Sequence, residues 1–162
     1  HGFDDQGRKS DGEGMLRDWW TAEDAAKFEA QAAKLGGQYE AYVFPQLPGL
    51  HINPKVAMGE NIGDLGGLTI ALEAYRRSLA GKPAPVIDGF TGEQRFFLGW
   101  AQVWKGMYRP ELMQMLLASD PHSPPEYRVN GVVPNIPAFY EAFKIQPGDK
   151  LYLDPAKRVK IW

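Results

Sequence analysis

Residues 59–79 read GENIGDLGGLTIALEAYRRSL, and this stretch decides the fold. Its apolar residues recur every three or four positions, which is the spacing of an amphipathic helix. They are Ile62, Leu65, Leu68, Leu72 and Tyr75. Each glycine in a helix costs roughly 1 kcal/mol relative to alanine. Glycines at Gly63, Gly66 and Gly67 inside so strong a pattern therefore predict the close approach of another element to this helix.

Helices are predicted on both sides of this stretch. Thr21 with Asp24 three residues later resembles a capping box, and the apolar stripe behind it predicts a helix to about Leu35, or to Tyr42 across two glycines. Periodicity and proline positions predict three further helices, at 91–108, 110–117 and 134–143. Loops rich in glycine, proline or serine are predicted at 1–14, 45–58, 81–90 and 120–125.

Strand signals are weak by comparison. Residues 127–133 form the best candidate for a strand, and no clearly alternating segment is longer. We therefore predict a mainly α fold with less than roughly 15% strand, against the usual 20–25%.

Composition excludes several classes of protein. The 162 residues suit one domain or part of one, and 44% hydrophobic residues allow a sizeable core. A net charge of −2 without a basic run argues against a nucleic-acid partner. The absence of a long apolar stretch argues against membrane contact from this segment. The chain has no cysteine, so disulfides and cysteine-bound metals are excluded.

Glu60 and Asp64 lie four residues apart, so they share one face of the predicted helix. Two interpretations stay open: a solvated acidic face, or a metal ligand with a supporting carboxylate. Few other charges surround the pair, and buried carboxylates need a metal or a donor. Zinc peptidases use two histidines and one glutamate as ligands, which leaves a position for water.

A second polar group lies in the proline-rich loop and just after it. His122 is either a surface residue or an imidazole oriented by Asp120, two positions earlier. Arg128 is either one half of a surface ion pair with Glu126 or a group that binds a carbonyl through its planar fork.

Three motifs give these residues a common context. They are residues 1–5 (HGFDD), residues 60–68 (ENIGDLGGL) and residues 120–128 (DPHSPPEYR). Together they resemble the neprilysin and endothelin-converting-enzyme family of zinc metallopeptidases, in particular bacterial endopeptidase O-like members, which lack the disulfides of the animal proteins. The similarity extends over essentially the whole chain. It implies the C-terminal, mainly helical part of a thermolysin-like (gluzincin) catalytic domain.

The resemblance assigns a role to each polar residue. His1 matches the second histidine of the H-E-x-x-H motif, so His1 and Glu60 would be zinc ligands. Asp64 would orient an imidazole ligand. His122 would stabilise the oxyanion of the tetrahedral intermediate and Asp120 would hold it in place. Arg128 would bind a backbone carbonyl of the substrate.

The same match implies that residues 1–162 are the C-terminal portion of a peptidase catalytic domain, truncated inside the H-E-x-x-H motif. The first histidine ligand and the catalytic glutamate would lie upstream. We therefore expect Zn²⁺ as cofactor, peptides as substrates, the missing N-terminal part of the protein as partner, and an extracytoplasmic location in bacteria. This chain alone would be inactive and would bind zinc weakly or not at all. The alternatives are a non-catalytic folded fragment, a peptide-binding module, or a calcium site in acidic loop 1–14.

Overall fold

A computed structural model describes residues 1–161, in which the regular elements are all helices joined by loops and turns. The α-helices are α1 (Ala22–Glu40), α2 (Pro54–Ser78), α3 (Gly92–Val103), α4 (Pro110–Ser119), α5 (Pro125–Asn130) and α6 (Pro137–Phe143). Single 3₁₀ turns occur at Gly7–Lys9, Val133–Asn135 and Pro155–Lys157. Within the described part of the chain there is no strand, only two isolated bridges, Ser10–Leu16 and Ile87–Phe90. The prediction of a mainly α fold is confirmed.

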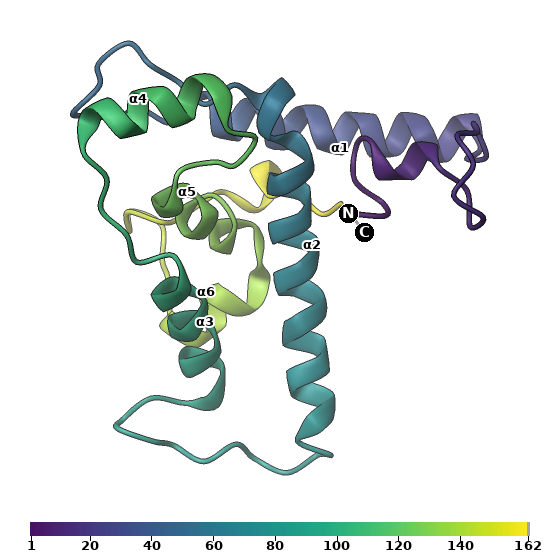
Figure 1. Ribbon diagram of the computed structural model, residues 1–162. Coiled ribbons are helices and arrows are strands. Elements are labelled where there is room, and N and C mark those ends of the chain that lie inside the picture. Colours follow the sequence, from purple (N-terminus) through teal and green to yellow (C-terminus); the bar gives the residue numbers. More distant parts are fainter. Residues whose placement is uncertain (162) are drawn as a thin grey trace.

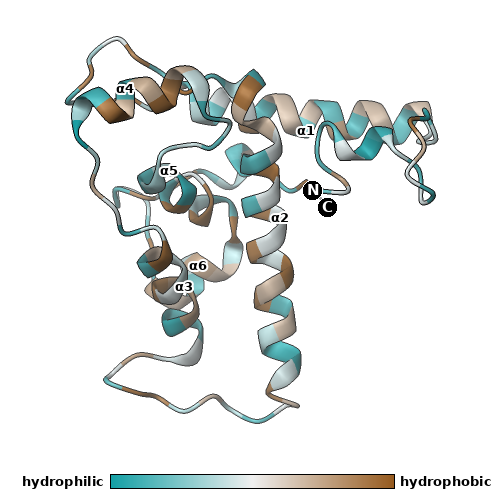
Figure 2. Ribbon diagram, viewed as in Figure 1, coloured by the Kyte–Doolittle hydropathy of each residue, from teal (hydrophilic) through white to brown (hydrophobic). Residues whose placement is uncertain are grey.

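Helix α2 is the longest element, and the other helices are arranged around it. Figure 1 shows α1 crossing near the N-terminal end of α2, while α3, α5 and α6 lie on one side of α2. Hydrophobic and hydrophilic bands alternate along α2 in Figure 2, as its apolar periodicity predicts. Of the described helices, none is both long and apolar enough to span a bilayer.

The helix starts follow from local chemistry. Thr21 accepts a hydrogen bond from the Asp24 backbone N–H and caps α1, as the sequence predicts. Asn53 caps α2 in the same way, with Pro54 at the first helical position. Helix α2 therefore begins five residues before the predicted Gly59. Helix α3 ends at Val103, five residues before the predicted Tyr108.

The predicted strand at 127–133 is wrong. Helix α5 occupies most of it, followed by the 3₁₀ turn at 133–135. Pro125 lacks a backbone N–H and fits the first position of a helix, so it starts α5 despite the valines that follow. The predicted helix at 134–143 is divided, because Pro137 holds the residue before it, Ile136, in an extended conformation.

The core positions α5, the helix that carries Arg128. Tyr39 of α1 is fully buried and donates to the Tyr127 carbonyl at 3.2 Å. Tyr127 in turn stacks on Tyr42 with ring centroids 4.3 Å apart. Burial raises the pKa of Tyr39 well above its ordinary value, so its hydroxyl stays a donor. This contact ties α5 to α1 and leaves the other side of α5 facing α2.

Candidate active site

Glu60 lies at the centre of the polar site. Its carboxylate lies between two imidazoles: His1 Nε2 is 3.4 Å from Oε1, and His122 Nε2 is 3.3 Å from Oε2. Arg128 Nη2 also approaches Oε2, at 3.2 Å. Three basic groups from three distant segments thus converge on one carboxylate of α2. Glu60, His122 and Arg128, which the resemblance assigns to one active site, thus lie together.

His1 is held by a carboxylate that the sequence reasoning missed. His1 Nδ1 lies 2.7 Å from Asp4 Oδ2, while Asp4 Oδ1 accepts the backbone N–H groups of Gln6 and Gly7 at 2.9 and 2.8 Å. Asp4 is only 6% exposed. This arrangement points Nε2 of His1 toward Glu60. A carboxylate three residues after a candidate ligand histidine was the available signal, because ligand histidines usually donate their second N–H to such a group.

The glycines of α2 allow the N-terminal segment to lie close. A Cβ added at Gly63 would lie 3.2 Å from His1 Cε1, and one at Gly59 would lie 3.1 Å from Asp5 Oδ1. The predicted close approach is therefore confirmed at Gly63. At Gly67 it is wrong, because nothing lies within 4 Å of a Cβ built there.

The spacing of the His1 and Glu60 donor atoms fits a zinc ion. Two donors bonded at about 2.1 Å in tetrahedral geometry are separated by about 3.4 Å, and His1 Nε2 and Glu60 Oε1 are 3.4 Å apart. Residues 1–161 contain no arrangement of three or more His, Cys, Asp or Glu side chains that could hold a metal ion. The described chain thus offers two donors, one fewer than a zinc peptidase uses.

Among the described residues Asp64 pairs with Arg128, and its role in orienting an imidazole ligand stays a prediction. Arg128 donates from Nε and Nη2 to the two oxygens of Asp64, at 2.7 Å each, and both side chains are buried. The guanidinium also lies over the Trp104 ring, 3.9 Å from its centroid. Burial raises the pKa of Asp64, and the hydrogen bonds and charge of Arg128 offset part of the rise. The alternative pairing of Arg128 with Glu126 is wrong: its ion-pair partners are Glu60 and Asp64.

Asp120 orients His122, which is one of the two alternatives that the sequence leaves open. Asp120 Oδ1 accepts the His122 backbone N–H at 2.8 Å and lies 2.6 Å from Nδ1 of the ring. These hydrogen bonds lower the pKa of Asp120, so it is a carboxylate at neutral pH. Next to His122 and Arg128 is a cavity of about 320 Å³ whose wall is largely apolar. Its lining includes Trp104, Tyr108, Met113, Leu116 and Pro124.

The sequence of this chain matches peptidase family M13 over residues 1–159. The chain belongs to peptidase family M13. Neprilysin-1 of Caenorhabditis elegans is 44% identical and human neprilysin 38% identical, each over the whole of this chain. In both cases the chain spans 22% of the length of the relative.

Solved structures agree with this assignment to M13. Zinc metalloprotease Zmp1 of Mycobacterium tuberculosis, in complex with an inhibitor, is 56% identical with a TM-score of 0.97. PepO from Lactobacillus rhamnosis is 34% identical with a TM-score of 0.84. All of this chain is covered in both, but only 25% and 24% of those chains. The fold is thus the C-terminal helical part of an M13 catalytic domain.

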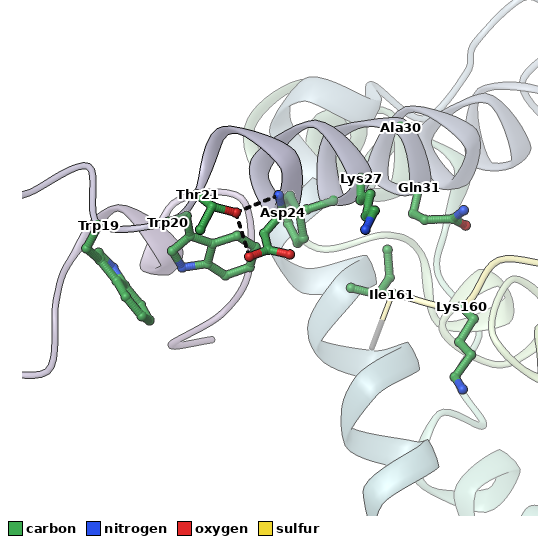
Figure 3. Close-up of a pocket in the computed structure, with 10 residues that line it drawn as sticks. Trp19, Trp20, Thr21, Asp24, Lys27, Ala30, Gln31, Lys160 and Ile161 are labelled. Atoms are coloured by element: carbon green, nitrogen blue, oxygen red, sulfur yellow. Dashed lines mark hydrogen bonds between the residues drawn. The ribbon is translucent and has the colours of Figure 1, made fainter.

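A second pocket of about 700 Å³ shares no lining residue with this site. It lies beside the first half of α1 and reaches Lys160 and Ile161 near the end of the chain (Figure 3). Trp19 and Trp20 line one end, where Thr21 bonds to Asp24. None of the residues that the sequence assigns to catalysis lines this pocket.

Proposed function

We propose that this chain supplies part of the active site of a zinc-dependent endopeptidase that hydrolyses peptide bonds of peptides or small proteins. The supporting observation is the convergence of His1, His122 and Arg128 on Glu60. His1 and Glu60 would hold the metal, with a third protein ligand supplied from outside residues 1–162. Bound zinc would polarise the scissile carbonyl and activate a water molecule.

His122 would donate a hydrogen bond to the oxyanion of the tetrahedral intermediate. Its Nδ1 faces Asp120, so Nε2 is the nitrogen that faces Glu60 and the open site. To donate from Nε2 while Nδ1 donates to Asp120, the ring must carry a proton on each nitrogen. A donor fixed in advance where negative charge develops is a large contribution to catalysis.

Arg128 would bind a backbone carbonyl of the peptide. Asp64 occupies its Nε and Nη2, and Glu60 also contacts Nη2. Among the hydrogen bonds of the described residues none involves Nη1, so this nitrogen is the one proposed to reach the substrate. Stacking on Trp104 fixes the plane of the guanidinium and hence the direction of that donor.

The test is made on the complete protein that contains this chain. Glu60→Ala should remove both bound zinc and the hydrolysis of an internally quenched peptide, because it deletes a metal ligand. The matched control is Glu126→Ala, which changes a glutamate of α5 that is not an ion-pair partner of Arg128. Retention of zinc and activity by Glu60→Ala would refute the proposed function.

A further inference from the structure

A buried hydrogen bond connects α2 to the loop that carries His122. Ser123 Oγ donates to Asn61 Oδ1 at 2.6 Å. Asn61 is 1% exposed and Ser123 is 2% exposed, so water does not compete for this bond. The two residues lie 62 positions apart in the chain.

The position of this bond relates it to the active site. Asn61 directly follows Glu60 on α2, and Ser123 directly follows His122 in the loop between α4 and α5. The bond therefore joins the two segments one residue beyond each functional group. Asp120 belongs to the same loop as His122, so it orients the ring without fixing where the loop lies relative to α2.

The 3.3 Å contact between His122 Nε2 and Glu60 Oε2 involves two groups that the proposed function assigns other tasks. Glu60 would bind the metal, and His122 Nε2 would donate to the substrate. The Asn61–Ser123 bond involves neither ring nor carboxylate and can persist through the reaction.

The polar side chain of Asn61 is best explained by its hydrogen bond with Ser123. Its Nδ2 is buried and has no hydrogen-bond partner among the described residues, although buried polar atoms are nearly always paired. A leucine of similar size would fill the space without that unpaired donor. Among the described residues, Ser123 is the hydrogen-bond partner of the Asn61 side chain, and an apolar residue could not accept that bond.

We propose that Asn61 is a positioning residue that, through Ser123, holds His122 at its working distance from Glu60. This inference rests on the proposed function. A misplacement of about 1 Å can lower a rate about 100-fold. Loss of the bond should therefore lower kcat without changing the zinc ligands.

The experiment uses the complete protein with Asn61→Leu and Ser123→Ala, each alone and combined with His122→Ala. We expect each single change to lower kcat about 10- to 100-fold, with KM and zinc content unchanged. In the His122→Ala background both changes should be silent, because Asn61 acts through His122. Asn135→Leu is the matched control. Asn135 is also a buried asparagine, but it bonds Gly131 and Val159 instead of the loop that carries His122. The kcat per folded molecule of this variant should equal that of the wild type.

Two results would overturn the proposal. One is a kcat within about twofold of the wild type for both single changes. The other is an equal loss of kcat with or without His122. If the wild type proves inactive, the proposed function fails, and the bond is then tested by NMR of the His122 ring. Ser123→Ala should shift or broaden those ring signals, and unchanged signals would refute the positioning role.

Discussion

Arg128 and Asp64 are separated by 64 residues, yet two hydrogen bonds of 2.7 Å join them, with each carboxylate oxygen accepting one. This fork-to-fork geometry is the strongest form of an arginine–carboxylate pair. It fastens α5 to α2 and aims Nη2 at Glu60. The pair is thus both a fold contact and part of the proposed site.

Arg128→Met should destabilise the chain by about 3–5 kcal/mol, because it leaves the buried Asp64 without a partner. Removing both charges with Arg128→Met and Asp64→Leu should restore part of that loss. Chemical denaturation of the wild type, Arg128→Met and the double variant measures the free energy of unfolding of each. Equal stability of Arg128→Met and wild type would contradict the prediction.

His122→Gln should lower kcat of the complete protein about 100- to 1,000-fold, the usual cost of losing an oxyanion donor. Bound zinc should remain, since the ligands proposed from this chain are His1 and Glu60. His51→Gln is the control: this exposed histidine bonds the Glu40 carbonyl at 2.9 Å and has no role in the proposed mechanism. Peptide hydrolysis and metal content are measured on the same samples. Loss of zinc by His122→Gln would count against the role of His122 as an oxyanion donor.

Gly7→Ala should weaken zinc binding by the complete protein about 10- to 100-fold, the range for losing a group that supports a metal ligand. A Cβ at Gly7 would lie 1.9 Å from the His1 backbone oxygen, so the backbone must move. That movement breaks the Gly7 N–H bond to Asp4 and releases His1. Gly12→Ala in the same segment is the control, because nothing lies within 4 Å of a Cβ there. Equal zinc affinities of the two variants would contradict this account.

The 162-residue chain alone should bind zinc far more weakly than the complete protein. His1 and Glu60 are two donors where zinc peptidases use three. Calorimetric titration of both proteins tests this, with Glu60→Ala as the control for specific binding. An affinity of the chain equal to that of the complete protein, and lost in Glu60→Ala, would show that the two-donor site suffices.

Local sequence patterns predicted the helices better than the site. The apolar period of α2 and Pro110 at the start of α4 were visible because they depend on neighbours in the chain. The predicted strand at 127–133 failed because Pro125 starts α5 and tertiary contacts hold that helix in place: Arg128 is buried against Asp64, and Tyr127 against Tyr42.

Functional roles could be assigned to the site residues only through the resemblance of the sequence to a family. Local spacing placed Glu60 and Asp64 on one face, and Asp120 beside His122. No local pattern could pair Ser123 with Asn61 or place Arg128 over Trp104, since such contacts depend on how the helices pack.

Asp120 should titrate below its ordinary value of 3.8, because the His122 backbone N–H and ring both donate to it. A carboxyl pKa that is depressed in the folded state stabilises the protein above the unfolded pKa, and that stabilisation is lost as the pH falls through the folded pKa. Protonation of Asp120 in acid should therefore weaken its hold on the 120–124 loop. At neutral and alkaline pH Asp120 stays ionised and its stabilisation of the loop should be kept. A ¹³C NMR titration of the Asp120 carboxyl measures the pKa directly. His122→Ala should raise it toward 3.8, whereas His51→Ala should leave it unchanged. A wild-type Asp120 that titrates at or above 3.8 would show that His122 does not hold this carboxylate in solution.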